Sequence, residues 1–189
     1  MKKNKPLISV IIPVFNQEKF IGRCLRSIIK QSIDRDLYEI IVINDYSKDL
    51  TKYALTQFHN EIKVLENKKN MGLPSSLNKG INEAKGEYII RLDSDDYVNV
   101  NYLLFLYEAI ITNDYDAVSC DYYLVDDNES IIERKYFQKN PIGCAILFKK
   151  DVFNEIGYYN EEFFRNEEQE FMLRFNKNKK IMNLPIPLY

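Results

Sequence analysis

The first half of the chain alternates short apolar runs with segments whose apolar residues recur at helical spacing. The runs are rich in β-branched residues, which predicts strands buried on both faces, as in a parallel sheet. These strands are expected at residues 7–12, 38–43, 62–66 and 87–92. Apolar residues at positions i, i+3 and i+4 predict the intervening helices. These helices are expected at residues 18–31, 53–58 and 74–84.

Four residues of the first half predict where these elements begin and end. Pro13 is expected to end the first strand, and Ser47 to cap the second helix through its hydroxyl. Pro74 suits the first turn of the third helix, and Gly86 is expected to end that helix.

Repeated strand-helix units predict a right-handed, doubly wound α/β fold with a parallel sheet. In such sheets, ligands bind beyond the carboxyl ends of the strands. The unusual polar stretches of the first half all follow predicted strands or the loop after one, so they are expected at a single edge of the sheet. They are residues 13–16, 44–47, 70–73 and 93–96.

The second half has a less regular rhythm, which predicts a strand-rich extension with an antiparallel hairpin. Helices are expected at residues 102–110, 151–156 and 167–176, with Gly157 stopping the second of these. Strands are expected at residues 117–125, 131–137, 143–148 and 181–184, with a turn at residues 126–129.

Three carboxylates lie together where the fourth strand is expected to end, at Asp93, Asp95 and Asp96. If the chain stays extended there, Asp93 and Asp95 point to the same side. Two carboxylates on one side suit a hard divalent cation, which usually keeps waters and phosphate oxygens as further ligands. The alternative is an acidic loop that caps the next helix. These residues by themselves do not decide between the two.

Two other polar positions have both a local and a chemical interpretation. Asp45 could accept hydrogen bonds from a nucleobase or a ribose, or it could help Ser47 to cap a helix. The acidic run of residues 167–170 could be a solvated first helical turn. It could also supply a carboxylate base that takes a proton from an attacking hydroxyl.

Composition removes several classes of function. A net charge of −2 argues against a dedicated nucleic-acid binder. The three cysteines are widely spaced and match neither a disulfide framework nor a zinc pattern, which favours a reducing compartment. The single histidine, His59, argues against histidine-based metal sites and Ser-His triads. No apolar run reaches the roughly 20 residues of a membrane span. The N-terminus is read as mature sequence, because Pro13 interrupts the apolar run that follows its lysines.

The chain has no glycine-rich phosphate loop of the dinucleotide-binding or P-loop type. The residues after the first strand also differ from the Gly- and Arg-rich loop of sugar nucleotidyltransferases. These enzyme classes are therefore disfavoured.

Several short motifs, taken in order, resemble those of the family 2 glycosyltransferases. The opening strand with its Pro-Val-Phe-Asn segment, and Asn44-Asp45-Tyr46-Ser47 after the second strand, resemble the start of that family. Leu92-Asp93-Ser94-Asp95-Asp96 is similar to its Asp-x-Asp metal motif. Glu167-Glu168 with Phe171 and Arg174 is similar to its Glu-Asp helix. Intermediate matches lie at residues 70–89 and 143–157, and the resemblance extends over residues 7–184.

The resemblance implies a GT-A fold, an α/β architecture with a Rossmann-like, mostly parallel central sheet flanked by helices. A small antiparallel extension is expected in the second half. Residues 1–189 would form a single domain. Residues 7–97 would form its nucleotide-binding half. Residues 98–189 would form the acceptor and base half, with a C-terminal part that is truncated or minimal.

The resemblance also implies inverting, metal-dependent transfer of a sugar from a nucleoside diphosphate, most often UDP, to an acceptor hydroxyl. Carried over by position, the residues that would line the donor nucleotide are Pro13, Val14, Asn16, Glu18, Asp45, Gly72, Asp93 and Ser94. Asp95, together with Asp93, would hold Mn²⁺ or Mg²⁺. Glu168 would be the general base.

The implied setting is bacterial surface polysaccharide or glycoconjugate synthesis, with a glycan, a lipid-linked molecule or a protein as acceptor. No nucleic-acid partner is expected. The expected location is the cytoplasm, with a peripheral association at the inner face of the cell membrane left open.

Two positions depart from the family pattern. Asn44 stands where the family usually has the first of two aspartates, and Glu168 stands where it usually has an aspartate as base. Glu167 or Glu170 could take the place of Glu168. A second hypothesis therefore stays open: a catalytically weak or inactive module of the same fold that binds a sugar nucleotide or a partner.

Overall fold

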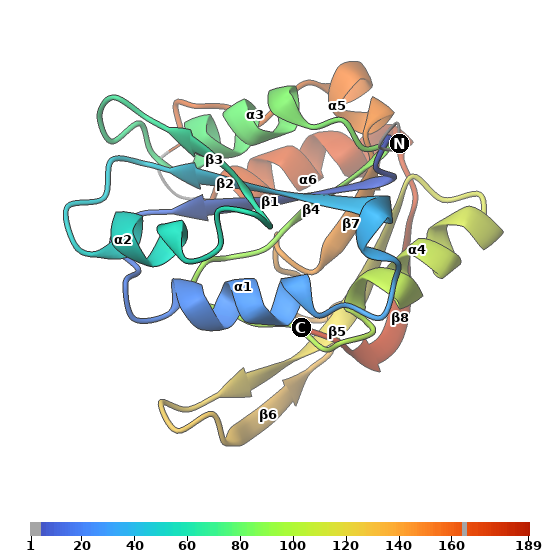
Figure 1. The fold of residues 1–189 in the computed structure, drawn as a ribbon. Helices are drawn as coiled ribbons and strands as arrows, with labels where there is room; N and C mark the ends of the chain where they lie inside the picture. Colours follow the sequence, from blue (N-terminus) through green and yellow to red (C-terminus); the bar gives the residue numbers. More distant parts are fainter. Residues whose placement is uncertain (1–4, 164–165) are drawn as a thin grey trace.

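The computed structural model describes residues 5–163 and 166–189, and an eight-stranded mixed sheet runs through both halves of the chain (Figure 1). The strand order is β3-β2-β1-β4-β7-β5-β6, and β8 pairs with β5. The strands are β1 (Ile8–Val14), β2 (Tyr38–Asn44), β3 (Lys63–Glu66), β4 (Tyr88–Arg91), β5 (Ala117–Val125), β6 (Ile131–Lys135), β7 (Ile146–Lys149) and β8 (Ile181–Pro187).

The first four strands form a parallel block, as the strand-helix alternation predicts. β1 pairs with β2 on one side and with β4 on the other, and β2 pairs with β3. Every residue of β1 is buried, because helices cover both faces of the sheet. α3 (Leu73–Glu83) lies on one face, and α1 (Ile21–Ile29) and α2 (Thr51–Thr56) lie on the other (Figure 1).

The second half adds strands to the free side of β4. β7 pairs antiparallel with β4 and with β5, so β4 has one parallel and one antiparallel neighbour. β5 and β6 form a hairpin that projects from the sheet (Figure 1). The expected α/β fold with an antiparallel extension is therefore confirmed. The division at residues 97/98 within a single domain stays a prediction.

Three helices complete the second half: α4 (Tyr102–Thr112), α5 (Asp151–Ile156) and α6 (Glu167–Asn178). An aromatic cluster fastens α5 and α6 to the sheet. In this cluster the Phe148 ring of β7 meets the rings of Phe153, Phe171 and Phe175 edge-on, each at a centroid distance of 5.6 Å. The contacts of Phe148 with Phe171 and Phe175 therefore fix the position of α6 against the sheet, beside the end of β4.

In the first half of the chain, a short 3₁₀ turn, η1 (Arg35–Leu37), precedes β2.

Three of the predicted boundary roles are wrong. β1 continues through Pro13 to Val14. The Ile11 carbonyl faces β4 and accepts from Leu92 N–H. Pro13, two residues further, therefore faces the side where β4 has already ended, and its missing N–H breaks no ladder bond. Ser47 does not cap α2. That helix begins after Leu50, and the Ser47 hydroxyl accepts the Asn16 N–H at 3.0 Å.

Gly86 does not end α3 as predicted, since the helix ends at Glu83 and its C-cap is Ala84. Gly86 is buried against the start of β1 instead. A Cβ atom there would lie 2.7 Å from the Ser9 backbone nitrogen and 2.8 Å from the Leu7 carbonyl oxygen. The glycine therefore allows two backbones to touch.

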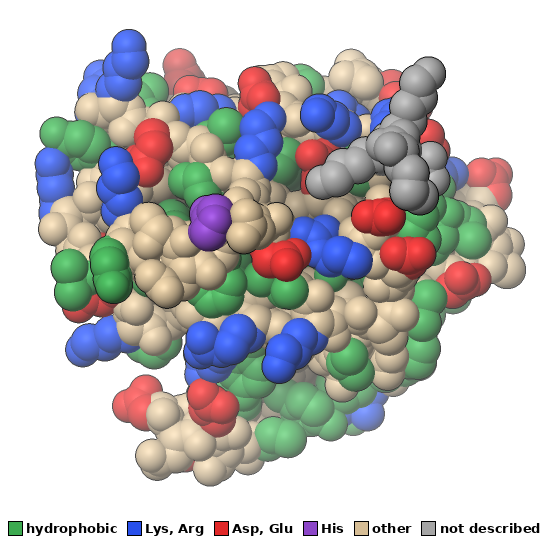
Figure 2. Space-filling view, viewed as in Figure 1, with side chains coloured by type: hydrophobic (Ala, Val, Ile, Leu, Met, Phe, Trp, Pro, Cys, Tyr) green, Lys and Arg blue, Asp and Glu red, His purple; other side chains and the backbone are tan. Residues whose placement is uncertain are grey.

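Within the described ranges, every helix is too short or too polar to cross a membrane. Residues 1–4, which contribute to the reading of the N-terminus as mature sequence, lie outside those ranges. On the face seen in Figure 2, acidic and basic side chains are interspersed rather than gathered by sign.

We expect Gly86→Ala to lower the free energy of unfolding by about 1–3 kcal/mol, because the new methyl group meets backbone that cannot move cheaply. Urea unfolding monitored by circular dichroism measures this. Gly22→Ala in α1 is the matched control. Its Cβ would lie 3.3 Å from the flexible end of Arg26 and should gain up to about 1 kcal/mol of helix propensity. Equal effects of the two substitutions would contradict the close-approach explanation.

Candidate active site

Two adjoining cavities open at the carboxyl edge of the parallel strands, where the polar stretches were expected. The smaller, about 310 Å³, lies over the ends of β1, β2 and β4, and the larger, about 840 Å³, extends towards β5, β8 and α6. Leu73, Arg91 and Asp93 line both cavities. A ligand in one cavity would therefore lie next to a ligand in the other.

The acidic stretch after β4 forms a tight turn. The Asp96 N–H donates to the Asp93 carbonyl at 3.1 Å, so the chain is not extended here. The premise that alternation puts Asp93 and Asp95 on one side is therefore wrong. Asp95 is exposed, and Asp93 and Asp96 are partly buried. All the same, Asp93 and Asp95 both line the smaller cavity.

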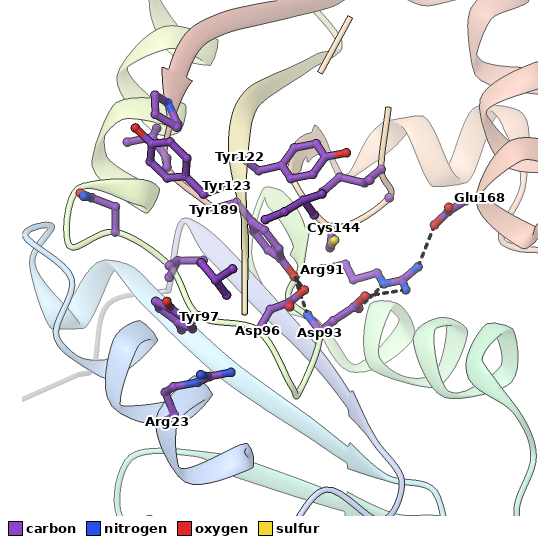
Figure 3. Close-up of a pocket in the computed structure, with 18 of the residues that line it drawn as sticks. Arg23, Arg91, Asp93, Asp96, Tyr97, Tyr122, Tyr123, Cys144, Glu168 and Tyr189 are labelled. Carbon is purple, nitrogen blue, oxygen red and sulfur yellow. Dashed lines mark hydrogen bonds and ion pairs between the residues drawn. The ribbon is translucent and has the colours of Figure 1, made fainter. Parts of the chain in front are cut away.

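Arg91, the last residue of β4, occupies the junction of the two cavities (Figure 3). Its Nε and Nη2 donate to the two carboxylate oxygens of Asp93, at 2.6 and 3.0 Å. Its Nη1 donates to Glu167 Oε1 at 3.3 Å and lies 3.5 Å from Glu168 Oε2. Burial would lower the pKa of Arg91, but the Asp93 carboxylate more than offsets this and raises that pKa well above its ordinary value.

Glu168 lies in the first turn of α6 and lines the larger cavity. Burial raises the pKa of Glu168, Arg91 opposes the shift, and Glu167 and Asp93 add to it. The carboxylate has room because residue 143 is glycine. A Cβ atom at Gly143 would lie 2.7 Å from Glu168 Oε2. A half-buried carboxylate with a raised pKa is suited to accepting a proton.

Tyr189, Asp96 and Cys144 lie together on another wall of the larger cavity (Figure 3). The Tyr189 hydroxyl donates to Asp96 Oδ2 at 2.5 Å and accepts the Asp93 N–H at 3.3 Å. Burial raises the pKa of Asp96 to about 6, while the hydrogen bond from Tyr189 limits the shift. Ligand atoms of Asp93, Asp96 and Cys144 all lie within 4.8 Å of one another.

Asp45 organises the loop after β3. Its Oδ1 accepts the Met71 N–H at 2.7 Å and the Asn67 amide at 2.8 Å, and its Oδ2 accepts the Gly72 N–H at 2.8 Å. Gly72 has a φ of +86°, a backbone conformation that favours glycine. Asp45 therefore does not cap α2. It fixes one wall of the smaller cavity.

Asn16 and Glu18 tie the loop after β1 to the loop after β2. The Asn16 amide oxygen accepts the Lys48 N–H at 2.8 Å, and the Glu18 carboxylate accepts the Leu50 N–H at 2.7 Å. In return, the Glu18 N–H donates to Asp49 at 3.0 Å. Neither Asn16 nor Glu18 is among the residues that line the smaller cavity. Their contacts support the loops around it.

The other predicted donor residues come together at the smaller cavity. Its lining includes Pro13, Val14, Asp45, Gly72, Asp93, Ser94 and Asp95. Asn44, the departure beside Asp45, is buried and donates to Glu66 Oε2 at 3.0 Å. An aspartate there would place a second carboxylate against Glu66. The assignment of each residue to the donor, the metal or proton transfer stays a prediction.

Sequence reasoning missed Arg91 and Tyr189. Arg91 carried a signal, because it is the only charged residue in the otherwise apolar run at residues 88–92. A charged residue is almost never buried in such a run unless it is paired. Tyr189 carried no signal that distinguishes it from the 13 other tyrosines.

Comparison with known proteins places the chain in a family. The family model described as "Glycosyl transferase family 2" matches residues 9–181. This chain belongs to glycosyl transferase family 2. A curated relative, the glycosyltransferase GlyG of Streptococcus pneumoniae, is 36% identical over 190 residues, which cover 85% of this chain and 62% of GlyG. The chain thus spans less than two thirds of the length of this relative.

Two solved structures have the same fold. S. aureus TarS (residues 1–349), crystallised with UDP-GlcNAc, aligns with a TM-score of 0.83 at 24% identity, covering 97% of this chain and 57% of that one. The mannosyltransferase PcManGT of Pyrobaculum calidifontis, with GDP-Man and Mn²⁺, aligns with a TM-score of 0.79 at 19% identity, covering 98% of this chain and 56% of that one. The expected GT-A fold is confirmed.

The acidic turn has oxygen donors that fit a hard divalent ion. Among the described residues, the Asp95 carboxylate contacts only the Gln17 amide, at 3.5 Å, so its lone pairs remain available at the smaller cavity. Both Asp93 oxygens accept from Arg91, and Asp96 accepts from Tyr189. The thiol of Cys144 is a soft ligand that suits Mg²⁺ and Mn²⁺ poorly. Of these three carboxylates, Asp95 therefore has the most lone pairs free for such an ion, and its role as a metal ligand stays a prediction.

We expect Asp45→Asn to lower the free energy of unfolding by about 1–3 kcal/mol, because an amide nitrogen then faces a backbone N–H that has lost its acceptor. Urea unfolding measures the change. Asp36→Asn, at an exposed carboxylate, is the control and should leave stability unchanged. If both variants unfold like the wild type, Asp45 does not hold the loop.

Proposed function

We propose that this domain binds a nucleoside diphosphate sugar, with UDP as the nucleotide, in the smaller cavity and transfers its sugar to an acceptor hydroxyl in the larger one. The observation that carries this proposal is the junction at Arg91. There, Asp93, which lines both cavities, and Glu168, which lines the larger one, contact the same guanidinium. The complex of TarS with UDP-GlcNAc supports the choice of a UDP-sugar.

In the proposed reaction, the acceptor oxygen attacks the anomeric carbon of the donor and forms the new glycosidic bond. The bond from that carbon to the diphosphate oxygen breaks, and the diphosphate leaves with the electron pair. Glu168 takes the proton of the acceptor hydroxyl. A single displacement inverts the anomeric configuration and needs no covalent intermediate.

Asp95, with Asp93 beside it, would hold Mn²⁺ or Mg²⁺ in this proposal. When bound, the ion would supply Lewis-acid stabilisation of the negative charge on the diphosphate. The Mn²⁺ in the PcManGT structure supports a metal of this kind. The loop held by Asp45 would form one wall of the nucleoside site. The hydrogen bonds of Asn16 and Glu18 would hold the loop after β1 against the loop after β2.

The hypothesis of a catalytically weak or inactive module predicts a different role for Glu168. It expects nucleotide binding without sugar release, because Glu168 would then have no chemical role. The raised pKa of Glu168 and its place in the wall of the larger cavity favour the enzyme. The acceptor is proposed as a glycan, lipid-linked or protein hydroxyl, as the family resemblance implies.

We expect UDP with Mn²⁺ to raise the melting temperature of the wild type. Saturation at 100 times the dissociation constant corresponds to about 2.7 kcal/mol. Asp95→Ala should lose most of this stabilisation, because the metal loses its principal ligand. A thermal-shift series with UDP, UDP-GlcNAc, GDP and GDP-mannose, each with Mn²⁺ or with EDTA, measures it. Asp127→Ala, on the exposed hairpin turn, is the control. Stabilisation by no nucleotide would reject the donor site.

We expect Glu168→Gln to slow sugar transfer or donor hydrolysis by about 10²–10⁴-fold, because the amide cannot accept the proton. In the wild type, the rate should fall on acidification already at a pH above the ordinary glutamate pKa of 4.5, since burial raises the pKa of Glu168. Release of UDP measured across pH tests both statements.

Two comparisons sharpen this experiment. Ionising Glu168 costs stability as the pH rises through its raised folded-state pKa, so Glu168→Gln should melt no lower than the wild type at neutral pH. Glu170→Gln is the matched control on the same helix, because the Glu170 carboxylate is bound to Arg174 at 2.6 Å. If Glu170→Gln abolishes turnover and Glu168→Gln does not, the base has been assigned to the wrong residue.

A further inference from the structure

We propose that Arg91 is a positioning residue that sets the location of the base Glu168 relative to the donor-side carboxylate Asp93. This inference rests on the proposed function. It concerns a residue to which neither the motifs nor the comparisons give a role.

The first part of the argument is how Arg91 binds Asp93. The two hydrogen bonds, at 2.6 and 3.0 Å, come from Nε and Nη2, so the guanidinium and the carboxylate meet as two parallel forks. Such bidentate pairs fix the orientation as well as the distance of the partners. The plane of the guanidinium is therefore set by Asp93.

The second part of the argument is how the other edge of the Arg91 guanidinium contacts α6. Nη1 is the nitrogen left over, and it faces the start of α6, with Glu167 Oε1 at 3.3 Å and Glu168 Oε2 at 3.5 Å. Glu167 is 5% exposed, so it serves as a buried anchor, while the Glu168 side chain is 36% exposed at the cavity wall. Arg91 thus restrains Glu168 without enclosing it.

The backbone around Arg91 holds the side chain in place and leaves room for its contact with Glu168. β4 is hydrogen-bonded on both sides, to β1 and to β7, which gives Arg91 a rigid origin. Gly143 lies against the contact. A Cβ atom there would be 3.2 Å from Arg91 Nη1 and 2.7 Å from Glu168 Oε2. A larger residue at position 143 would push the guanidinium and the base apart.

A lysine could keep the charge at position 91 but not the geometry. Its ammonium is a compact point charge that cannot present one edge to Asp93 and another to α6. Without the fork, three carboxylates at the junction would share one poorly placed cation, and repulsion would displace the most exposed of them, Glu168. A misplacement of about 1 Å near the reacting atoms can cost about 10²-fold in rate.

The test is a double-mutant cycle of Arg91→Lys and Glu168→Gln, read by UDP release from the donor that the thermal-shift series selects. We expect Arg91→Lys to lower kcat by about 10²-fold in the Glu168 background. The affinity for UDP with Mn²⁺, measured by titration calorimetry, should stay within about threefold of the wild type. In the Glu168→Gln background, Arg91→Lys should change kcat by less than about threefold, because the group through which it acts is already disabled.

Arg35→Lys is the control for replacing a paired arginine. Arg35 also bonds a carboxylate, Glu61, together with backbone carbonyls, but it lies in η1 and lines neither cavity. It should keep wild-type kcat. Circular dichroism and melting curves of each variant establish the temperature range in which all are folded.

Three outcomes would overturn the inference. Arg91→Lys could turn over like the wild type, its loss could be the same in both backgrounds, or UDP affinity could fall in parallel with kcat. Each would mean that Arg91 does not act through Glu168. A wild type that binds UDP and releases it from the donor leaves the proposed function standing in all three cases. A wild type that binds no nucleotide and releases none overturns the proposed function, and this inference with it.

Discussion

A buried guanidinium surrounded by carboxylates from both halves of the chain is the interaction on which the candidate site depends. A charge removed from water is tolerated only where opposite charges and hydrogen bonds replace its hydration. Arg91 meets this condition through Asp93 on its own segment and through Glu167 and Glu168 on α6. Together with the aromatic cluster around Phe148, this pairing holds the start of α6 against the end of β4, where the two cavities meet.

Several polar residues at the sheet edge hold the backbone of the neighbouring loops. Asp45 fixes the backbone of residues 71–72, and Asn16 and Glu18 fix that of residues 48–50. Each carboxylate or amide satisfies backbone N–H groups that a loop would otherwise leave to water. Loops held in this way by the chain's own hydrogen bonds favour ligand binding, because less order has to be imposed when a ligand binds.

Much of this architecture could be predicted from the sequence, because β-branched runs and helical periodicity are local signals. They located the parallel block, its edge and the polar stretches that line the smaller cavity. The partners of those residues could not be predicted, since Arg91 and Glu167 lie 76 positions apart and no spacing rule joins them. The turn at residues 93–96 and the backbone contact of Gly86 were missed for a related reason. Both depend on neighbouring backbone rather than on the residue type.

The double pairing of β4 also bears on how the protein is made. Residues are added from the N-terminus, so Arg91 emerges long before β7 and α6 exist, and the parallel block can form first. Asp93, which bonds the guanidinium through both of its oxygens in the folded protein, is only two residues away and is therefore available to Arg91 throughout that interval. This local pair spares the nascent sheet an isolated charge at its edge. Glu167 and Glu168 of α6 come 76 and 77 positions after Arg91, so the charge cluster at the junction of the two cavities can be completed only after the parallel block has been synthesised.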